Sequence, residues 1–149
     1  MPANFKYRAL DDLGCGDGKV TLLLKQVFSP SRVRGFDINP SLVKRAKERG
    51  IEAEVKNLER ELPQGELAVV WGVLHHLREK ENFLKRLKEG YKFIFIREPV
   101  KNHHFHGFEL GRPLTQEEIK HLRERHLPSS KLVHFEDNIL IFYQATKGA

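Results

Sequence analysis

The feature that most constrains this chain is a glycine-rich segment at residues 9–20, where an apolar run leads through two aspartates into three closely spaced glycines. Gly14, Gly16 and Gly18 allow the backbone a positive φ and let a ligand approach the main chain. A helix is predicted directly after them, so the N–H groups of its first turn and the positive end of its dipole should face the same space. The segment therefore predicts a small-molecule site at the carboxyl end of a strand.

The rest of the chain alternates predicted strands and helices. Strands are predicted at residues 5–13, 32–38, 51–58, 67–72 and 91–96, a closing hairpin at 132–135 and 139–146, and helices at 20–28, 40–49, 79–89 and 115–126. No full helix is predicted between the third and fourth strands. This order predicts an α/β fold with a mostly parallel sheet covered on both faces, and ligands in such sheets bind outside the carboxyl ends of the strands.

Local signals predict how several helices pack and end. Thr115 and Glu118 form the pattern of a capping box, and Gly50 and Gly90 are predicted as left-handed residues that terminate helices. The first helix is expected to bury a stripe of apolar side chains against the sheet: Val20, Leu23, Leu24, Val27 and Phe28.

Composition limits the class of protein. The length of 149 residues fits one domain spanning residues 1–149, and 40% hydrophobic with 31% charged residues suits a folded core. No apolar run approaches the roughly 20 residues of a membrane span. With no apolar signal region at the start and one cysteine, we expect a cytoplasmic protein without a membrane partner. The net charge of +6 permits an anionic partner without requiring one.

Residue spacing separates three ligand classes for the glycine turn. A phosphate-binding P-loop is excluded, because Gly18-Lys19 is followed by Val20 and its earlier glycine would fall on Leu13. A dinucleotide fingerprint fits weakly, because the third glycine stands at 18 rather than 19 and Asp12 precedes the turn. A nucleotide-binding oxidoreductase domain is therefore the weaker alternative.

The third class rests on a resemblance. Residues 12–18 follow the pattern D-x-G-x-G-x-G and resemble the signature of the class I S-adenosylmethionine-dependent methyltransferases. Three further features follow in the same order as in the family. They are the acidic residue Asp37, the polar residue Asn57 and the segment 67–77, which resembles the family's F-D-x-V-x-x-x-x-V-L-H-H-L. The usual aspartate starting that segment is replaced by Leu67 or, one residue earlier, by Glu66. The resemblance covers nearly the whole chain and implies a Rossmann-like seven-stranded sheet of order 3-2-1-4-5-7-6 with an antiparallel last strand.

The resemblance also implies a cofactor, S-adenosylmethionine, and the residues that hold it. The acid before the glycine turn, here Asp12, anchors the cofactor's amino group, and the acid ending the second strand, here Asp37, accepts from both ribose hydroxyls. Asn57 stands where the family often has an aspartate that meets the adenine amine, and its amide oxygen can also accept. The implied cofactor-binding residues are Asp12, Gly14, Cys15, Gly16, Asp37, Ile38, Asn57, Leu58, Trp71 and Gly72.

Catalytic residues are weakly specified. Methyl transfer starts from an activated sulfonium, so positioning supplies much of the catalysis, and a base is needed only if the acceptor must lose a proton. His75, His76 and Glu98 are candidates. The two histidines are more typical of a segment that orders the turn after the strand. Glu98 either faces the acceptor or pairs with Arg97.

A long loop at residues 99–114 is predicted to contact the substrate. Its ordinary alternative is an exposed loop without a role. A metal site is not predicted there, because neither a cysteine nor a clear carboxylate set accompanies the histidines. The residues assigned to substrate contact are His103, His104, Phe105, His106 and Phe108.

Partners and acceptor stay open at this stage. We expect a minimal member that lacks most of the family's N-terminal helical region, so the site is either open or covered by the late loop, a partner chain or a second copy. A small-molecule acceptor is slightly favoured over RNA. The basic runs at 44–49 and 85–88 are expected on solvent-facing helix surfaces, with an RNA footprint as the alternative. The alternative function is a non-catalytic cofactor-, RNA- or protein-binding module with a methyltransferase fold.

Overall fold

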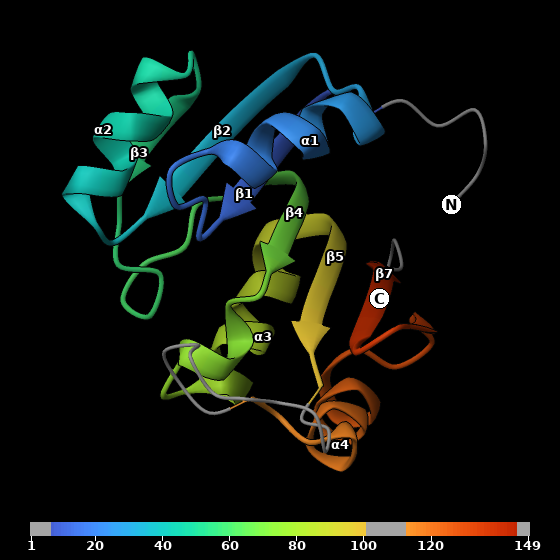
Figure 1. Ribbon diagram of the computed structural model, residues 1–149. Coiled ribbons are helices and arrows are strands. Elements are labelled where there is room, and N and C mark those ends of the chain that lie inside the picture. The colour runs from blue at the N-terminus through green and yellow to red at the C-terminus, as the bar shows by residue number, and fades with distance from the viewer. Residues whose placement is uncertain (1–6, 101–112, 146–149) are drawn as a thin grey trace.

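The computed structural model describes residues 7–100 and 113–145, which form seven strands, four α-helices and a short 3-10 helix (Figure 1). The strands are β1 (Ala9–Leu13), β2 (Arg32–Asp37), β3 (Glu52–Val55), β4 (Gly65–Trp71), β5 (Tyr91–Pro99), β6 (Lys131–Phe135) and β7 (Asn138–Gln144). The helices are α1 (Lys19–Phe28), α2 (Pro40–Glu48), η1 (Leu74–His76), α3 (Lys80–Gly90) and α4 (Gln116–His126).

The strands form one sheet of order β3-β2-β1-β4-β5-β7-β6. The first five strands pair in parallel, and β7 runs antiparallel to both β5 and β6. This confirms the α/β fold and the strand order that the resemblance implies. The chain makes only a turn between β3 and β4, also as predicted. β3 ends at Val55, earlier than predicted, because the chain turns at Asn57.

Helices cover both faces of this sheet (Figure 1). Alternate residues of a strand face opposite sides, so the four residues at 67–70, all without exposed surface, divide between two cores and confirm β4 as a central strand. Leu67 and Val69 pack with α1, whereas Ala68 and Val70 share a cluster with α3 and α4. None of the described helices is long and apolar enough to cross a membrane.

The buried face of α1 differs from the predicted stripe. Leu24 and Phe28 are buried as expected, but Leu23 is 60% exposed and Val27 is 72% exposed. Thr21, with no exposed surface, takes the remaining inward position because its hydroxyl donates to Asp12 Oδ2 at 2.6 Å. A hydrogen bond to β1 therefore determines which face of α1 is buried. The spacing of apolar residues in the sequence does not reveal this contact.

Two of the three predicted helix-end signals are confirmed. Thr115 and Glu118 form the capping box, and Gly50 follows α2 with a φ of +86°. The prediction for Gly90 is wrong: this residue is the last of α3 and lacks a positive φ, because β5 begins directly at Tyr91 and leaves no loop for a left-handed residue.

A buried charge network ties β1 to its neighbours. Asp11 is 1% exposed, and its carboxylate accepts two hydrogen bonds from Arg34, at 2.7 and 2.5 Å. The Tyr91 hydroxyl donates to the same carboxylate at 2.7 Å, and burial is the main reason that the pKa of Tyr91 is raised. Asp11 thus joins β1, β2 and β5 away from the glycine turn.

Candidate functional site

The turn between β1 and α1 has three glycines with positive φ, +88° at Gly14, +55° at Gly16 and +87° at Gly18. A Cβ at position 14 would lie 2.5 Å from Val73 Cγ2, and one at position 18 would lie 2.4 Å from Ile51 Cδ1. A Cβ at position 16 would meet no heavy atom within 4 Å. Gly14 and Gly18 are therefore needed for close packing within the protein, whereas Gly16 borders open space.

Backbone amides of this turn are used within the protein. Gly18 N–H donates to Cys15 O at 3.1 Å, and Lys19 N–H donates to Asp17 Oδ1 at 3.1 Å. The expectation that the amides starting α1 face a ligand is thus wrong for these two groups. Phosphate sites depend on free amides at this position, so the turn suits a ligand bound through other groups.

Asp12, the residue before the last of β1, has a carboxylate that is 1% exposed. Its Oδ2 accepts from Thr21, but its Oδ1 has no hydrogen-bond partner among the residues that the structure describes. Burial is the main reason that its pKa is raised to about 6, and the nearby Asp37 contributes. A buried carboxylate oxygen without a donor is costly, so the site favours a ligand that brings a donor or a positive charge.

Asp37 ends β2 on the other side of Gly16. Its Oδ2 accepts the Gly16 N–H at 2.9 Å and its Oδ1 accepts the Asn39 N–H at 2.9 Å, so two backbone contacts fix the carboxylate. Each oxygen retains capacity for a further donor. Ile38, the next residue, is 63% exposed. The end of β2 therefore presents an oriented carboxylate next to an apolar surface.

The structure gives three other predicted cofactor residues contacts of their own. Asn57 Oδ1 accepts the Glu59 N–H at 3.1 Å, which shapes the turn after β3. Leu58 is buried in the larger core cluster. The Cys15 side chain packs beside Gly35, and its thiol lies 3.5 Å from the Gly16 carbonyl oxygen. Burial is the main reason that the pKa of this thiol is raised to about 12. These contacts leave the predicted cofactor roles of Asn57, Leu58 and Cys15 untested.

Trp71 and Gly72 lie where β4 ends, next to the glycine turn. Gly72 has a φ of +70°, and its N–H donates to Arg97 O at 2.7 Å. The Arg97 guanidinium lies over the Trp71 ring, 5.3 Å from its centroid. Val73 packs directly against Gly14, so the end of β4 and the glycine turn form one continuous surface.

The candidate catalytic residues meet at η1. Glu98, 1% exposed, accepts the Leu74 N–H at 2.7 Å through Oε1, and its Oε2 lies 3.0 Å from His75 Nδ1. Burial raises the pKa of Glu98 to about 7, against the lowering effects of the Leu74 N–H, Arg97 and His76. Glu98 thus holds η1 rather than pairing with Arg97, because successive strand residues point to opposite faces. His75 is buried and His76 is exposed.

Of the predicted substrate loop, residues 101–112 lie outside the described residues, whereas its ends are described: Pro99 is the last residue of β5, and Val100 forms a parallel bridge with Leu114. Its members, for which the substrate role stays a prediction, are His103, His104, Phe105, His106 and Phe108. Across residues 7–100 and 113–145, no three His, Cys, Asp or Glu side chains gather in a way that could hold a metal ion.

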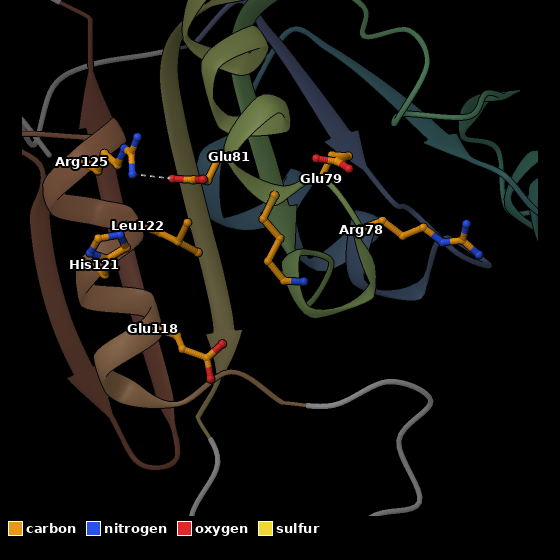
Figure 2. Close-up of a pocket in the computed structure, with 8 residues that line it drawn as sticks. Arg78, Glu79, Glu81, Glu118, His121, Leu122 and Arg125 are labelled. Carbon is orange, nitrogen blue, oxygen red and sulfur yellow. Dashed lines mark ion pairs between the residues drawn. The ribbon is translucent and has the colours of Figure 1, made fainter.

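A charged groove lies between the start of α3 and α4 (Figure 2). Glu81 Oε1 lies 3.4 Å from Arg125 Nη1 across this groove and 3.0 Å from His126 Nε2. These contacts join α3 to α4. The groove's lining residues are Arg78, Glu79, Lys80, Glu81, Glu118, His121, Leu122 and Arg125, none of which belongs to the surface around Gly16.

The family model and a curated relative that match this chain are both methyltransferases. The model of the methyltransferase domain family matches residues 11–93, more than half of the chain. Trans-aconitate 2-methyltransferase of Mycobacterium sp. (strain KMS) is 35% identical over 63 residues, which cover 42% of this chain and 25% of that protein. The chain thus matches about a quarter of the length of these curated relatives.

Solved structures share the fold. The methyltransferase domain of bacterial-CtHen1-C superposes with a TM-score of 0.73 at 22% identity, covering 93% of this chain and 90% of that one. Human N-acetylserotonin methyltransferase in complex with SAM superposes with a TM-score of 0.74 at 17% identity, covering 95% of this chain and 48% of that one. At these identities the similarity concerns the fold alone.

Proposed function

Because the chain belongs to the methyltransferase domain family with a class I fold, we propose that it binds S-adenosylmethionine at the β1–α1 turn and methylates a small molecule. One observation carries the proposal. Asp12 is a buried carboxylate with one oxygen that has no partner within residues 7–100 and 113–145, on the strand that leads into the glycine turn with its open Gly16. A cationic amino group supplies the donor and the charge that this oxygen lacks.

The remaining site residues fit the same cofactor. Asp37 would accept from the ribose hydroxyls, and its two backbone contacts orient it before the ligand arrives. Ile38 would contact the adenine face with its exposed side chain. The turn at Asn57 and Leu58 would border the adenine edge, with the backbone of Gly14, Cys15, Gly16 and the end of β4 around the methionine part. When bound, S-adenosylmethionine supplies an activated methyl group on its sulfonium.

The names of relatives support a small-molecule acceptor. Trans-aconitate 2-methyltransferase, 35% identical over 63 residues, is named for a small molecule. If the acceptor must lose a proton, the exposed His76 is better placed to take it than the buried His75. Glu98 and His75 would then position η1, which carries His76.

Calorimetric titration with S-adenosylhomocysteine, the demethylated cofactor, tests the proposal. We expect measurable binding to the wild type and at least about tenfold weaker binding to Asp12→Asn, which removes the charge but keeps the side-chain shape. Asp137→Asn is the matched control, since Asp137 lies exposed in the β6–β7 turn, and it should bind like the wild type. Absent binding at millimolar ligand, or equal binding to both variants, would overturn the proposal.

A further inference from the structure

A second pocket, of about 350 Å³, opens where β4, β5 and the β6–β7 hairpin end. Trp71, Arg97 and Leu140 are direct neighbours across β4, β5 and β7, and they therefore face the same side of the sheet. Phe135 and Asn138 are paired at the hairpin end and complete the lining. This is the side covered by α1, since Trp71 packs against the cluster that contains Leu24.

The walls of this pocket are mainly apolar and accessible. Phe135 is 59% exposed, and Val133, which pairs with Leu140, is 55% exposed. Trp71 is half-buried, with the Phe95 ring stacked beside it at 6.5 Å. Large apolar side chains gathered around a concave surface are typical of a ligand site, and two aromatic rings suit a flat ligand.

Arg97 is the only charged residue among the five that line the pocket. Its guanidinium is stacked over Trp71 and donates no hydrogen bond to any residue that the structure describes, so its N–H edge can meet an anion. The missing side chain of Gly72 makes room for this arrangement, because a Cβ there would lie 3.1 Å from Arg97 Nη1. Glu98 points to the opposite face, where Leu74 and His75 hold it. A carboxylate is therefore the complementary group that a ligand should bring.

The pocket adjoins the cofactor turn through two residues. Trp71 leads into Gly72 and Val73, and Val73 Cγ2 occupies the space that a side chain at Gly14 would need. A molecule against Trp71 thus lies beside the surface that runs from the end of β4 to Gly14 and Gly16.

We propose that this pocket is the acceptor site and that its acceptor is a flat, largely apolar molecule with a carboxylate, held by Arg97 with its apolar part against Trp71 and Phe135. The assignment deepens the proposed methyltransferase function and rests on it. It specifies a class of acceptor from the residues that line the pocket.

Fluorescence of Trp71, the only tryptophan of the chain, reports directly on this pocket. The full chain is titrated with phenylacetate and with its neutral match, phenylacetamide, with and without saturating S-adenosylhomocysteine. Because hydrogen bonds to charged groups are the stronger ones, we expect phenylacetate to bind at least about tenfold more tightly. Arg97→Gln should remove this preference. Lys92→Gln, which loses the same charge at an exposed position of β5, should retain it.

The outcomes separate the pocket from the cofactor site. Equal binding of acid and amide to the wild type overturns the acceptor class, and this comparison needs no variant to fold. A preference that persists in Arg97→Gln, with wild-type thermal unfolding, overturns the role of Arg97. Calorimetry with S-adenosylhomocysteine runs in parallel. Cofactor binding without an acid preference contradicts only the pocket assignment, whereas an acid preference without cofactor binding contradicts the methyltransferase function and the acceptor role with it.

Discussion

At the scale of single residues, the adjacent Asp11 and Asp12 have opposite environments. Both are 1% exposed, but Asp11 is fully engaged by Arg34 and Tyr91, whereas Asp12 keeps an oxygen without a described donor. Successive strand residues face opposite sides, so one carboxylate serves the sheet and the other borders the glycine turn. This division separates two measurable effects, on stability and on binding.

Asp11→Asn should strongly destabilise the fold. The change leaves Arg34 in its partly buried position without a carboxylate, and breaking such pairs costs about 3 kcal/mol or more. Urea unfolding measures this loss. Asp137→Asn, at an exposed turn, should change the free energy of unfolding by less than about 0.5 kcal/mol. Equal stability of the two variants would show that the network contributes little.

Cofactor affinity should depend on pH through Asp12. Its pKa is raised to about 6 in the ligand-free fold, and a cationic amino group beside it favours the ionised carboxylate. Binding of S-adenosylhomocysteine should therefore strengthen as the pH rises from about 5 to about 7. Calorimetry across this range should show the increase in the wild type and not in Asp12→Asn. The same slope in both proteins would assign the titration to another group.

At the scale of elements, the glycine turn combines a packed end and an open middle. Gly18→Ala places a Cβ 2.4 Å from Ile51, whereas Gly16→Ala meets no atom within 4 Å. Gly16→Ala should thus cost only the left-handed backbone penalty, about 1–2 kcal/mol, and Gly18→Ala should cost more. Urea unfolding ranks the two variants. A larger loss for Gly16→Ala would contradict the geometry of the turn.

The η1 segment depends on Glu98. Its pKa in the fold, about 7, lies above the ordinary value of 4.5, so the folded state binds the proton more tightly than the unfolded chain. The contribution of Glu98 to stability should therefore be greatest at acidic pH and fall as the pH rises from about 4.5 to about 7, by up to about 3 kcal/mol. Asp12, whose pKa is raised to about 6, adds a slope of the same sign at lower pH. Glu98→Gln should therefore reduce the slope in urea unfolding most clearly between about pH 6 and about pH 7. An unchanged slope would mean that the carboxyl is not the titrating group.

Element positions were largely predictable, because hydrophobic periodicity and helix caps are local signals. The capping box at Thr115 follows from neighbouring residues alone. The buried face of α1 was not predictable in this way, since it depends on a hydrogen bond from Thr21 to β1. The prediction of a left-handed helix end at Gly90 was wrong, because the sequence does not show that β5 starts directly after α3 without a loop.

At the scale of the whole molecule, parallel strands bring distant residues to one edge of the sheet. Asp12 and Asp37 lie at the carboxyl ends of neighbouring parallel strands, one residue before the end of β1 and at the end of β2, which is why their motifs could be assigned to one site from the sequence. The pocket at Trp71 and Arg97 escaped prediction, because its residues come from four strands and include Phe135 and Leu140, which belong to no motif. Arg97 becomes a candidate ligand-binding residue only when the structure shows its guanidinium stacked on Trp71.

A crystal structure with S-adenosylhomocysteine is the direct test of cofactor binding at the β1–α1 turn. We expect the amino group of the ligand within hydrogen-bond distance of Asp12 Oδ1, the ribose hydroxyls on Asp37, and the sulfur directed toward the pocket of Trp71. A ligand bound elsewhere, or Asp12 Oδ1 still without a donor in the occupied site, would contradict it.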